Sequence, residues 1–333
     1  MKAVRLRSVH DLGLDDVAVP EPGPGEVLVR VEAAGVCGTD RHLHRGEFPC
    51  TPPVTLGHEF CGTIVARGPG VDLAEGALVA CDPNDGCGTC PLCREGRVNL
   101  CPRNVATGVH RDGGFAPFAT FPARRAHVLP AGLDPRFGAF CEPLACTLHG
   151  IDLAALRPGE RAAVIGGGVI GQLAVQLAAM AGAEVAMLTR SAERQALSRR
   201  GGAHHACGTP EALRALWPEG AEAVLECAGV PETVALAPAL TRPGGRVVVM
   251  GVLPRGRQVP FEPFDLLVRE IAVRFAFLNP FTQGRAAGLI AAGRIDVAPL
   301  ISREVSLAAL PGVIANPPGP GEIRVIARPD AAG

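Results

Sequence analysis

Between residues 159 and 183, apolar and small residues predict a strand, a glycine-rich turn and a helix that ends at Gly182. A second apolar strand is predicted at residues 184–189, followed by a helix from about Ser191. Further strand-like runs occupy residues 223–229 and 245–251. Because strands alternate with helices, this region is expected to have an α/β fold with a doubly wound parallel sheet.

The chain before this region follows a different pattern, with many prolines, glycines and short alternating runs. Residues 26–32 and 60–67 are typical of short strands bounded by turns. The tail from about Gln283 combines a helix with a strand-like run at residues 322–327. We therefore expect a smaller β-rich part beside the doubly wound sheet.

The composition limits the function. Of the 333 residues, 47% are hydrophobic and 20% charged, as in globular proteins. The net charge of −1 gives no electrostatic basis for binding nucleic acid or an anionic membrane, and the apolar runs are too short for a membrane span. The N-terminus has no secretory apolar segment, so we expect a cytoplasmic protein whose twelve cysteines are thiols or metal ligands. With no tyrosine and a single lysine, Lys2, mechanisms that need a tyrosine or a buried lysine are excluded.

The glycine-rich turn carries the pattern G-x-G-x-x-G. Its first glycine permits a tight turn, its second lets the backbone approach a pyrophosphate, and its third lets helix and strand pack closely. A predicted strand precedes it and a predicted helix follows, which is the context of a dinucleotide site. The residues expected to bind the cofactor here are Gly166, Gly168, Val169, Ile170 and Gly171.

Four cysteines form a C-x2-C-x2-C-x7-C array, namely Cys87, Cys90, Cys93 and Cys101. Three thiols two residues apart can turn around one ion, and a fourth from the end of the loop completes a tetrahedron. Four sulfur ligands leave no open position, so a zinc ion here would be structural. An iron–sulfur cluster is the chemical alternative, because four thiolates also suit it.

A second group of metal-ligand types lies near the N-terminus. The stretch G-V-C-G-T-D contains Cys37, and T-L-G-H-E-F supplies His58 and Glu59. A catalytic zinc needs about three protein ligands and one open position. Cys37 and His58 would provide a sulfur and a nitrogen, and the third ligand could be Glu59 or a residue of C-E-P-L-A-C at residues 141–146.

The residues that follow Cys37 suggest a route for a proton. Thr39 and His42 lie two and five positions further on, so a hydroxyl near the metal and an imidazole nearer solvent could pass a proton outward. Asp40, between them, is predicted to cap a helix rather than to act chemically.

In their order along the chain, these motifs resemble the zinc-dependent medium-chain dehydrogenase/reductase superfamily over essentially the whole length. The similarity is greatest to the branch of sorbitol (L-iditol), threonine and butanediol dehydrogenases. The resemblance implies a GroES-like catalytic domain made of residues 1–147 and 282–333, and a Rossmann domain at residues 148–281.

The resemblance also implies roles for the site residues. Cys37 and His58 would bind catalytic zinc, and Glu59 would be a ligand or near-ligand. Glu142 of E-P-L would be a ligand or hold a metal-bound water, with Cys146 as the rival for its place. We favour Glu142, because its motif is intact. Thr39 and His42 match the proton relay of the family.

The expected reaction is reversible oxidation of a secondary alcohol in a polyol, diol, sugar or amino alcohol, with hydride transfer to a nicotinamide ring. Enzymes that use NAD commonly place Asp or Glu at the end of the second Rossmann strand. This chain has Thr189 there, followed by Arg190 and then Arg194. Because a hydroxyl and a guanidinium suit a 2′-phosphate, we expect NADP rather than NAD.

Two alternatives come from other classes of protein. A zinc-independent enone or quinone reductase of the same fold would lack Cys37, His58 and the four-cysteine array. A non-catalytic metal- or nucleotide-binding protein would not need an open metal position beside a proton relay. The expected partners are a small alcohol or ketone and, as is usual in this family, further copies of the chain in a homodimer or homotetramer.

Overall fold

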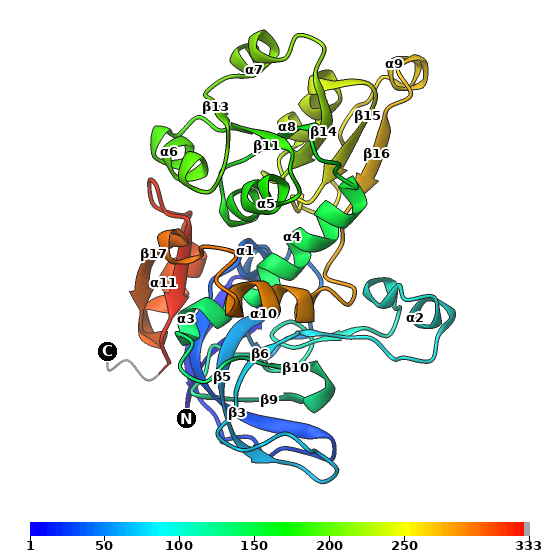
Figure 1. The fold of residues 1–333 in the computed structure, drawn as a ribbon. Coiled ribbons are helices and arrows are strands. Elements are labelled where there is room, and N and C mark those ends of the chain that lie inside the picture. The colour runs from blue at the N-terminus through cyan, green and yellow to red at the C-terminus, as the bar shows by residue number, and fades with distance from the viewer. Residues whose placement is uncertain (330–333) are drawn as a thin grey trace. The chain divides into compact units, whose positions relative to one another are not determined.

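The computed structural model describes residues 1–329, and the chain forms two units, each built around its own sheet (Figure 1). Unit 1 contains Met1–Ala145 and the chain from Asn279 onward, and unit 2 contains Cys146–Leu278. The division falls within helix α4 (Cys141–Ala154). Each unit is described by itself below.

Unit 2 has a six-stranded parallel sheet, with strands in the order β13 (His205–Cys207), β12 (Glu184–Leu188), β11 (Arg161–Ile165), β14 (Ala221–Glu226), β15 (Thr241–Val249) and β16 (Ala272–Phe275). Apolar side chains cover both of its faces. Along β11, Ala162 and Val164 belong to one hydrophobic cluster, and Ala163 and Ile165 belong to another. The near-continuous apolar strands of this region are therefore those of a parallel sheet buried on both sides. The predicted doubly wound α/β fold is confirmed.

The helices of unit 2 begin with the expected local signals. Ser191 and Thr209 cap two of them through side-chain oxygens, and proline occupies the first turn of three. After α4, the helices are α5 (Val169–Met180), α6 (Ala192–Arg200), α7 (Pro210–Leu216), α8 (Pro231–Leu236), the 3-10 turn η3 (Ala237–Leu240) and α9 (Pro263–Val268).

Unit 1 is β-rich, as its short alternating runs indicated. Its main sheet has the order β10 (Ala126–Val128), β6 (Leu78–Cys81), β5 (Glu59–Arg67), β3 (Glu26–Gly35), β18 (Arg324–Ala327) and β17 (Ile301–Val305), and β9 (Phe118–Pro122) also pairs with β3. The smaller sheets contain β2 (Asp11–Asp16), β1 (Lys2–Ser8) and β4 (Val54–Thr55), and β7 (Asn84–Asp85) with β8 (Val105–Ala106).

Short helices connect the strands of unit 1. They are α1 (Gly38–His44), α2 (Pro91–Arg94), η1 (Val98–Leu100), η2 (Ala123–Arg125), α3 (Pro135–Gly138), α10 (Gln283–Ala291), η4 (Ala298–Leu300), η5 (Leu307–Ala309) and α11 (Leu310–Ala315). The core of this unit includes Val29, Phe60 and Phe121 from the N-terminal strands and Val325 from the tail, so both ends of the chain build it.

Two features join the tail to the N-terminal strands of unit 1. Strand β18 pairs antiparallel with β3, and Ile326 lies opposite Gly35. A buried hydrogen-bond network holds Asn279, where the chain re-enters unit 1. The side-chain amide of Asn279 donates to Asp82 at 3.1 Å and accepts from Asn84 at 2.6 Å. The tail therefore delivers its side chains to the same sheet as β3 and β5.

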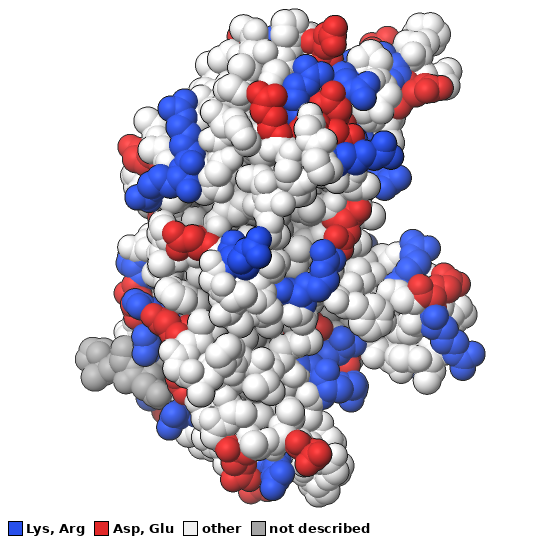
Figure 2. Space-filling model, viewed as in Figure 1, with Lys and Arg blue, Asp and Glu red and all other residues white. Residues whose placement is uncertain are grey.

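The surface has no region dominated by one sign of charge in the view of Figure 2, where basic and acidic side chains mingle on the visible face. This mixture agrees with the net charge of −1. Within residues 1–329, no helix has the length and apolar character that crossing a membrane requires.

Candidate active site and metal centres

Cys37 is held in place by the start of helix α1. It is the N-cap residue, and its Sγ accepts a hydrogen bond from the Thr39 backbone N–H at 3.4 Å. The Asp40 carboxylate accepts from the Cys37 backbone N–H at 2.8 Å, which completes a capping box. The prediction that Asp40 caps a helix is confirmed, and the box fixes the direction of the Cys37 thiol.

His58 and Glu59 reach the same place from the beginning of β5. The turn before them needs glycine, because Gly57 has φ of +94° and a Cβ there would lie 2.7 Å from the Phe115 backbone nitrogen. One ligand atom each from Cys37, His58 and Glu59 lies within 4.8 Å of the other two. The structure therefore brings together three of the residues that the sequence predicted for a catalytic metal.

The two nitrogens of His58 have different surroundings. Nδ1 lies 3.4 Å from Oδ1 of the fully buried Asp40, so Nε2 is the nitrogen that remains for a metal. Burial alone would lower the pKa of His58, but the negative charges of Asp40 and Cys37 outweigh it and raise this pKa well above its usual value. Asp40 thus caps α1 and also places a carboxylate oxygen next to the His58 imidazole.

Arg324 of β18 was not predicted from the sequence, where it appeared as one polar residue in a strand-like run. Its side chain is only 5% exposed, and its Nη1 lies 2.7 Å from Oε2 of Glu59, which is 1% exposed. Nη1 also donates to the Val36 carbonyl at 2.6 Å, and the guanidinium lies over the Phe140 ring at 5.9 Å. A buried cation therefore faces the carboxylate of the candidate metal group.

The electrostatics of this group fit a bound cation. Burial raises the pKa of the Cys37 thiol, and the nearby Glu59 charge raises it further. Burial also raises the pKa of Glu59, although Arg324 and His58 act in the opposite direction. Such crowded donors keep protons that a metal ion would displace. A sulfur, an imidazole nitrogen and a carboxylate oxygen form a ligand set that zinc takes in proteins.

The other predicted ligands lie on helix α4. Glu142 is buried in its first turn and is close enough to Arg324 to raise the pKa of that guanidinium, but Glu142 is not a member of the three-residue group. Cys146 is one turn further along the same helix. The choice between these two residues therefore stays a prediction.

Thr39 and His42 both lie on α1, three residues apart and hence on one face of the helix. Both are half-buried. The Nδ1 atom of His42 lies 2.7 Å from Oε2 of Glu47, in the turn that follows the helix. Glu47 is a second residue that the sequence did not single out.

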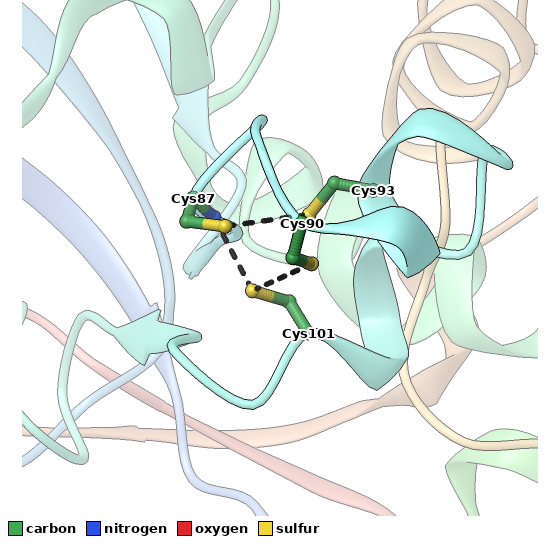
Figure 3. A group of neighbouring side chains, drawn as sticks. All are labelled: Cys87, Cys90, Cys93 and Cys101. Carbon is green, nitrogen blue, oxygen red and sulfur yellow. Dashed lines mark hydrogen bonds between the residues drawn. The ribbon is translucent and has the colours of Figure 1, made fainter.

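The four-cysteine array forms a compact sulfur cluster, shown in Figure 3. Cys90 lies at the N-cap position of α2, Cys93 lies within this helix, and Cys101 follows η1, so these two short turns fold three of the thiols back toward Cys87. The Cys87 and Cys93 sulfurs are 4.0 Å apart, and those of Cys90 and Cys101 are 3.8 Å apart. Tetrahedral zinc with bonds of about 2.3 Å separates its sulfurs by about 3.8 Å, so the cluster fits one ion.

Hydrogen-bond donors around the cluster favour a thiolate at Cys87. Hydrogen bonds from the backbone and side chain of Thr89 lower the pKa of Cys87 to about 5, whereas burial raises the pKa of Cys93 to about 12. The Arg103 guanidinium donates to the Cys87 sulfur at 3.1 Å, and the Arg103 backbone N–H donates to the Cys101 sulfur at 3.4 Å. All four sulfurs face one another, which is the geometry of a closed, structural metal site.

In unit 2 the glycine turn lies at the end of β11, and each of its three motif positions favours glycine for a different reason. Gly166 has φ of +100°, and a Cβ on Gly171 would lie 1.8 Å from the Gly166 carbonyl oxygen. A Cβ on Gly168 would instead meet nothing within 4 Å, and Gly168 provides no side chain to cap α5. The sheet order reverses between β11 and β14, so this open helix N-terminus stands at the switch point where dinucleotides bind.

The residues predicted to choose between NAD and NADP lie just after β12. The Thr189 backbone is held at both ends, because its N–H donates to the Cys207 carbonyl and its carbonyl accepts from Gln195. Thr189 Oγ1 lies 3.0 Å from where a Cβ of Gly167 would be, so its hydroxyl points at the glycine turn. Arg190 is exposed, and Arg194 is half-buried in the first turn of α6.

Comparison with known proteins agrees with both units. Residues 23–131 match the alcohol dehydrogenase GroES-like domain, and residues 169–291 match the zinc-binding dehydrogenase family. A sorbitol dehydrogenase of Halalkalibacterium halodurans is 34% identical over 82% of this chain and 83% of its own length. An L-galactonate-5-dehydrogenase of Escherichia coli (strain K12) is 41% identical, over 53% of this chain and 52% of its own length.

Among solved structures, one described as a zinc-binding dehydrogenase from Sinorhizobium meliloti 1021, bound to NADP, has 51% sequence identity and a TM-score of 0.95. The match covers 98% of this chain and 99% of that one. The chain therefore belongs to the zinc-dependent medium-chain dehydrogenase/reductase superfamily, and it is an oxidoreductase that transfers a hydride between an alcohol and a nicotinamide cofactor.

Proposed function

We propose that Cys37, His58 and Glu59 hold the catalytic zinc and that Glu142 completes the set, with Cys146 as the alternative on the same helix. The observation that carries the proposal is the convergence of three different donor types within 4.8 Å, next to the buried charged side chains of Asp40 and Arg324. When bound, zinc would supply a Lewis acid to the hydroxyl of the substrate.

The residues of the chain supply the remaining functions. Asp40 orients His58, as carboxylates behind metal-binding histidines do. Arg324 balances the charge of Glu59, which would otherwise repel an anionic oxygen at the site. Thr39 takes the proton of the substrate hydroxyl and passes it to His42, whose side chain is 19% exposed.

The substrate class is a secondary alcohol within a polyhydroxylated or amino-substituted chain, namely a polyol, diol, sugar, sugar acid or amino alcohol. This proposal is supported by the names of the relatives, which include sorbitol, L-galactonate and L-threonine dehydrogenases. A structural match of 29% identity and TM-score 0.90 is a galactitol-1-phosphate dehydrogenase.

The experiment is a metal analysis of the purified protein combined with an NAD(P)H absorbance screen across these alcohols. Two zinc ions per chain and activity with at least one alcohol are expected. Cys37→Ser should remove one zinc ion and the activity, whereas Cys50→Ser, at a half-buried cysteine outside both metal groups, should change neither. Full activity in a protein that lacks zinc would disprove the proposal.

We also propose NADP as the preferred cofactor. The support is the absence of a carboxylate at Thr189, the guanidinium of the adjacent Arg190, and the NADP bound to the 51%-identical relative. The kcat/KM for NADP⁺ should exceed that for NAD⁺, and Thr189→Asp/Arg190→Ala should reverse the order, because the new carboxylate binds the ribose diol and repels a 2′-phosphate. A wild-type preference for NAD⁺ would refute this assignment.

The four-cysteine cluster is proposed to hold the second, structural zinc, since its sulfur spacings suit a single tetrahedral ion. Retention of this zinc in Cys37→Ser, measured by elemental analysis, tests the assignment. The compartment is proposed to be the cytoplasm, because the twelve cysteines fit thiols or metal ligands, as reducing compartments maintain them.

The oligomer is proposed to be a homodimer or a homotetramer that uses the β16 edge of unit 2. Strand β16 is the last of its sheet, and apolar side chains crowd around it, with Phe264 70%, Leu267 72% and Phe275 64% exposed. An exposed apolar edge strand invites pairing with a second copy. Phe275→Glu should shift the mass measured by light scattering from an oligomer to a monomer, and an unchanged mass would count against this surface.

A further inference from the structure

The turn after helix α1 ties Glu47 to His42 through the backbone. The Gly46 N–H donates to the Leu43 carbonyl at 3.1 Å, and the Glu47 N–H donates to the His42 carbonyl at 2.8 Å. Gly46 has φ of +72°. Together these features form a Schellman motif, in which Glu47 is the second residue after the cap and His42 is the third from the helix end.

The side chains at these two positions are unusual for the motif. A hydrophobic contact commonly joins them in a Schellman cap. Here the contact is polar, because Nδ1 of His42 lies 2.7 Å from Oε2 of Glu47. The His42 side chain is 19% exposed and that of Glu47 is 31% exposed, so the pair lies partly in water. The chain thus places a carboxylate against the proposed relay histidine where packing alone would favour an apolar residue.

The hydrogen bond determines which imidazole nitrogen carries the proton. A carboxylate oxygen only accepts, so Nδ1 of His42 must donate, and Nε2 keeps its lone pair. A histidine that receives a proton needs this lone pair, and its tautomer is set by the bond that the other nitrogen makes. An adjacent carboxylate also stabilises the imidazolium that forms.

We propose that Glu47 is a positioning residue of the proton relay, which holds His42 in the tautomer that accepts a proton at Nε2 and provides the countercharge for the resulting imidazolium. The inference rests on the proposed relay through Thr39 and His42. The proton of the substrate hydroxyl passes to Nε2, and the imidazolium then releases a proton to water, which restores the starting tautomer.

Other charged groups near His42 are directed elsewhere. The Asp40 carboxylate is held by the Cys37 N–H and faces His58. The Arg41 guanidinium donates to carbonyls of residues 313 and 316 and approaches Glu322, and the His44 ring packs edge-on against His10. Arg45, the C-cap residue, is exposed. Glu47 is therefore the charged residue with which the described structure pairs the His42 side chain.

The test compares Glu47→Gln and Glu47→Leu with His42→Ala, using zinc-loaded protein and one alcohol substrate. Because backbone atoms make the Schellman motif, both Glu47 variants should fold, and Leu restores the apolar contact that is usual for the motif. Thermal unfolding and zinc content check this. The matched control is Glu184→Gln, which breaks a similar pair with His205 at 2.8 Å on strands of unit 2.

The main readout is how the effect divides between kcat and KM for alcohol oxidation. In Glu47→Leu the side chain at this position cannot accept from Nδ1–H of His42, so kcat should fall about 3- to 10-fold, less than for loss of the histidine itself, while KM stays unchanged. Glu47→Gln, whose amide oxygen can still accept from Nδ1–H, should keep more of the rate than Glu47→Leu. Glu184→Gln should match the wild type.

The outcomes separate this inference from the relay on which it rests. If His42→Ala slows oxidation while Glu47→Leu keeps the wild-type rate, the role of Glu47 is disproved and the relay stands. If His42→Ala keeps the wild-type rate, the relay and the role of Glu47 both fail. Support requires a lower kcat at unchanged KM in Glu47→Leu, a smaller loss in Glu47→Gln, and no further effect of Glu47→Leu when His42 is already alanine.

Discussion

The two cysteine-containing groups of unit 1 use the same thiol in opposite surroundings. Around Cys37 the donors are of three kinds, His58 and Glu59 are buried, and the charged side chains of Asp40 and Arg324 pair with these two residues. The four-cysteine cluster has only sulfur donors and is surrounded by backbone N–H groups and the exposed Arg103. The first group has three candidate ligands beside buried charged side chains, whereas the second group has all four ligands of a tetrahedral metal ion.

This difference indicates how one residue type comes to serve reactivity in one place and stability in the other. A complete tetrahedron leaves no position for substrate, whereas a three-donor group does. The open group needs a rigid and charged environment, because its geometry is not closed by its own ligands. Accordingly, its supporting side chains are more deeply buried than those of the closed cluster, as Asp40 and Arg103 illustrate.

The sharpest test exchanges one thiol in each group. Cys37→Ser should lower kcat/KM by at least about 10³-fold, since Lewis-acid assistance supplies several kcal/mol to the transition state, and should leave the unfolding temperature nearly unchanged. Cys101→Ser should have the opposite profile, with a free energy of unfolding lower by more than about 3 kcal/mol and the chemistry of the remaining folded protein intact.

Enzyme kinetics and chemical denaturation of the two variants, with Cys50→Ser as the control, measure these opposite effects on activity and stability. Equal losses of activity and stability in both variants would show that the two groups do not divide their roles in this way.

A second prediction concerns the buried pair behind the open group. Arg324→Gln should lower the free energy of unfolding by about 3–5 kcal/mol, because it leaves the Glu59 carboxylate buried without its partner. The control is Arg303→Gln, which breaks a pair with Glu322 whose arginine is 48% exposed and which should cost less than about 1 kcal/mol. Urea unfolding of both variants checks the difference, and similar losses would contradict the importance of burial.

A third prediction tests the residue that orients His58. Asp40→Asn should reduce zinc affinity at the Cys37 group by about 10- to 100-fold, as loss of a carboxylate behind a metal-bound histidine does. Competition with a chromogenic chelator gives the affinity of each zinc. The four-cysteine zinc should be unaffected, and Asp16→Asn, at an exposed pair with Lys2, should change neither. A wild-type zinc affinity in Asp40→Asn would show that Asp40 does not support zinc binding at the Cys37 group.

The sequence was sufficient for the fold class because its strongest patterns were local. The strand, glycine turn and helix over residues 159–183 became β11 and α5, with φ of +100° at Gly166 and a helix that ends before Gly182. The sequence did not predict the very short strands of unit 1. Strands of two residues, such as β4 and β7, are defined by pairing with distant segments and carry no periodicity of their own.

The site was predictable to the extent that its residues lie within motifs. Cys37, His58 and Glu59 converge as expected, whereas the roles of Glu142 and Cys146 stay predictions. Arg324 was missed because its partner Glu59 is 265 residues away, and only the β18–β3 pairing brings them together. Glu47 was missed because a Schellman turn, not sequence spacing alone, directs it to His42.

The smallest effect is expected at the closed cluster, from Arg103→Ala. Its guanidinium donates to the Cys87 sulfur at 3.1 Å, but the side chain is exposed, so water can replace it. The backbone N–H of residue 103 still donates to Cys101, and the Thr89 hydroxyl still donates to Cys87. We expect zinc to leave the cluster only about 3- to 10-fold faster, measured by transfer to a chromogenic chelator, with kcat unchanged. If zinc left the cluster about 100-fold faster, the effect would be as large as the loss of zinc affinity expected for Asp40→Asn. The closed cluster would then depend on its surroundings as strongly as the open group does.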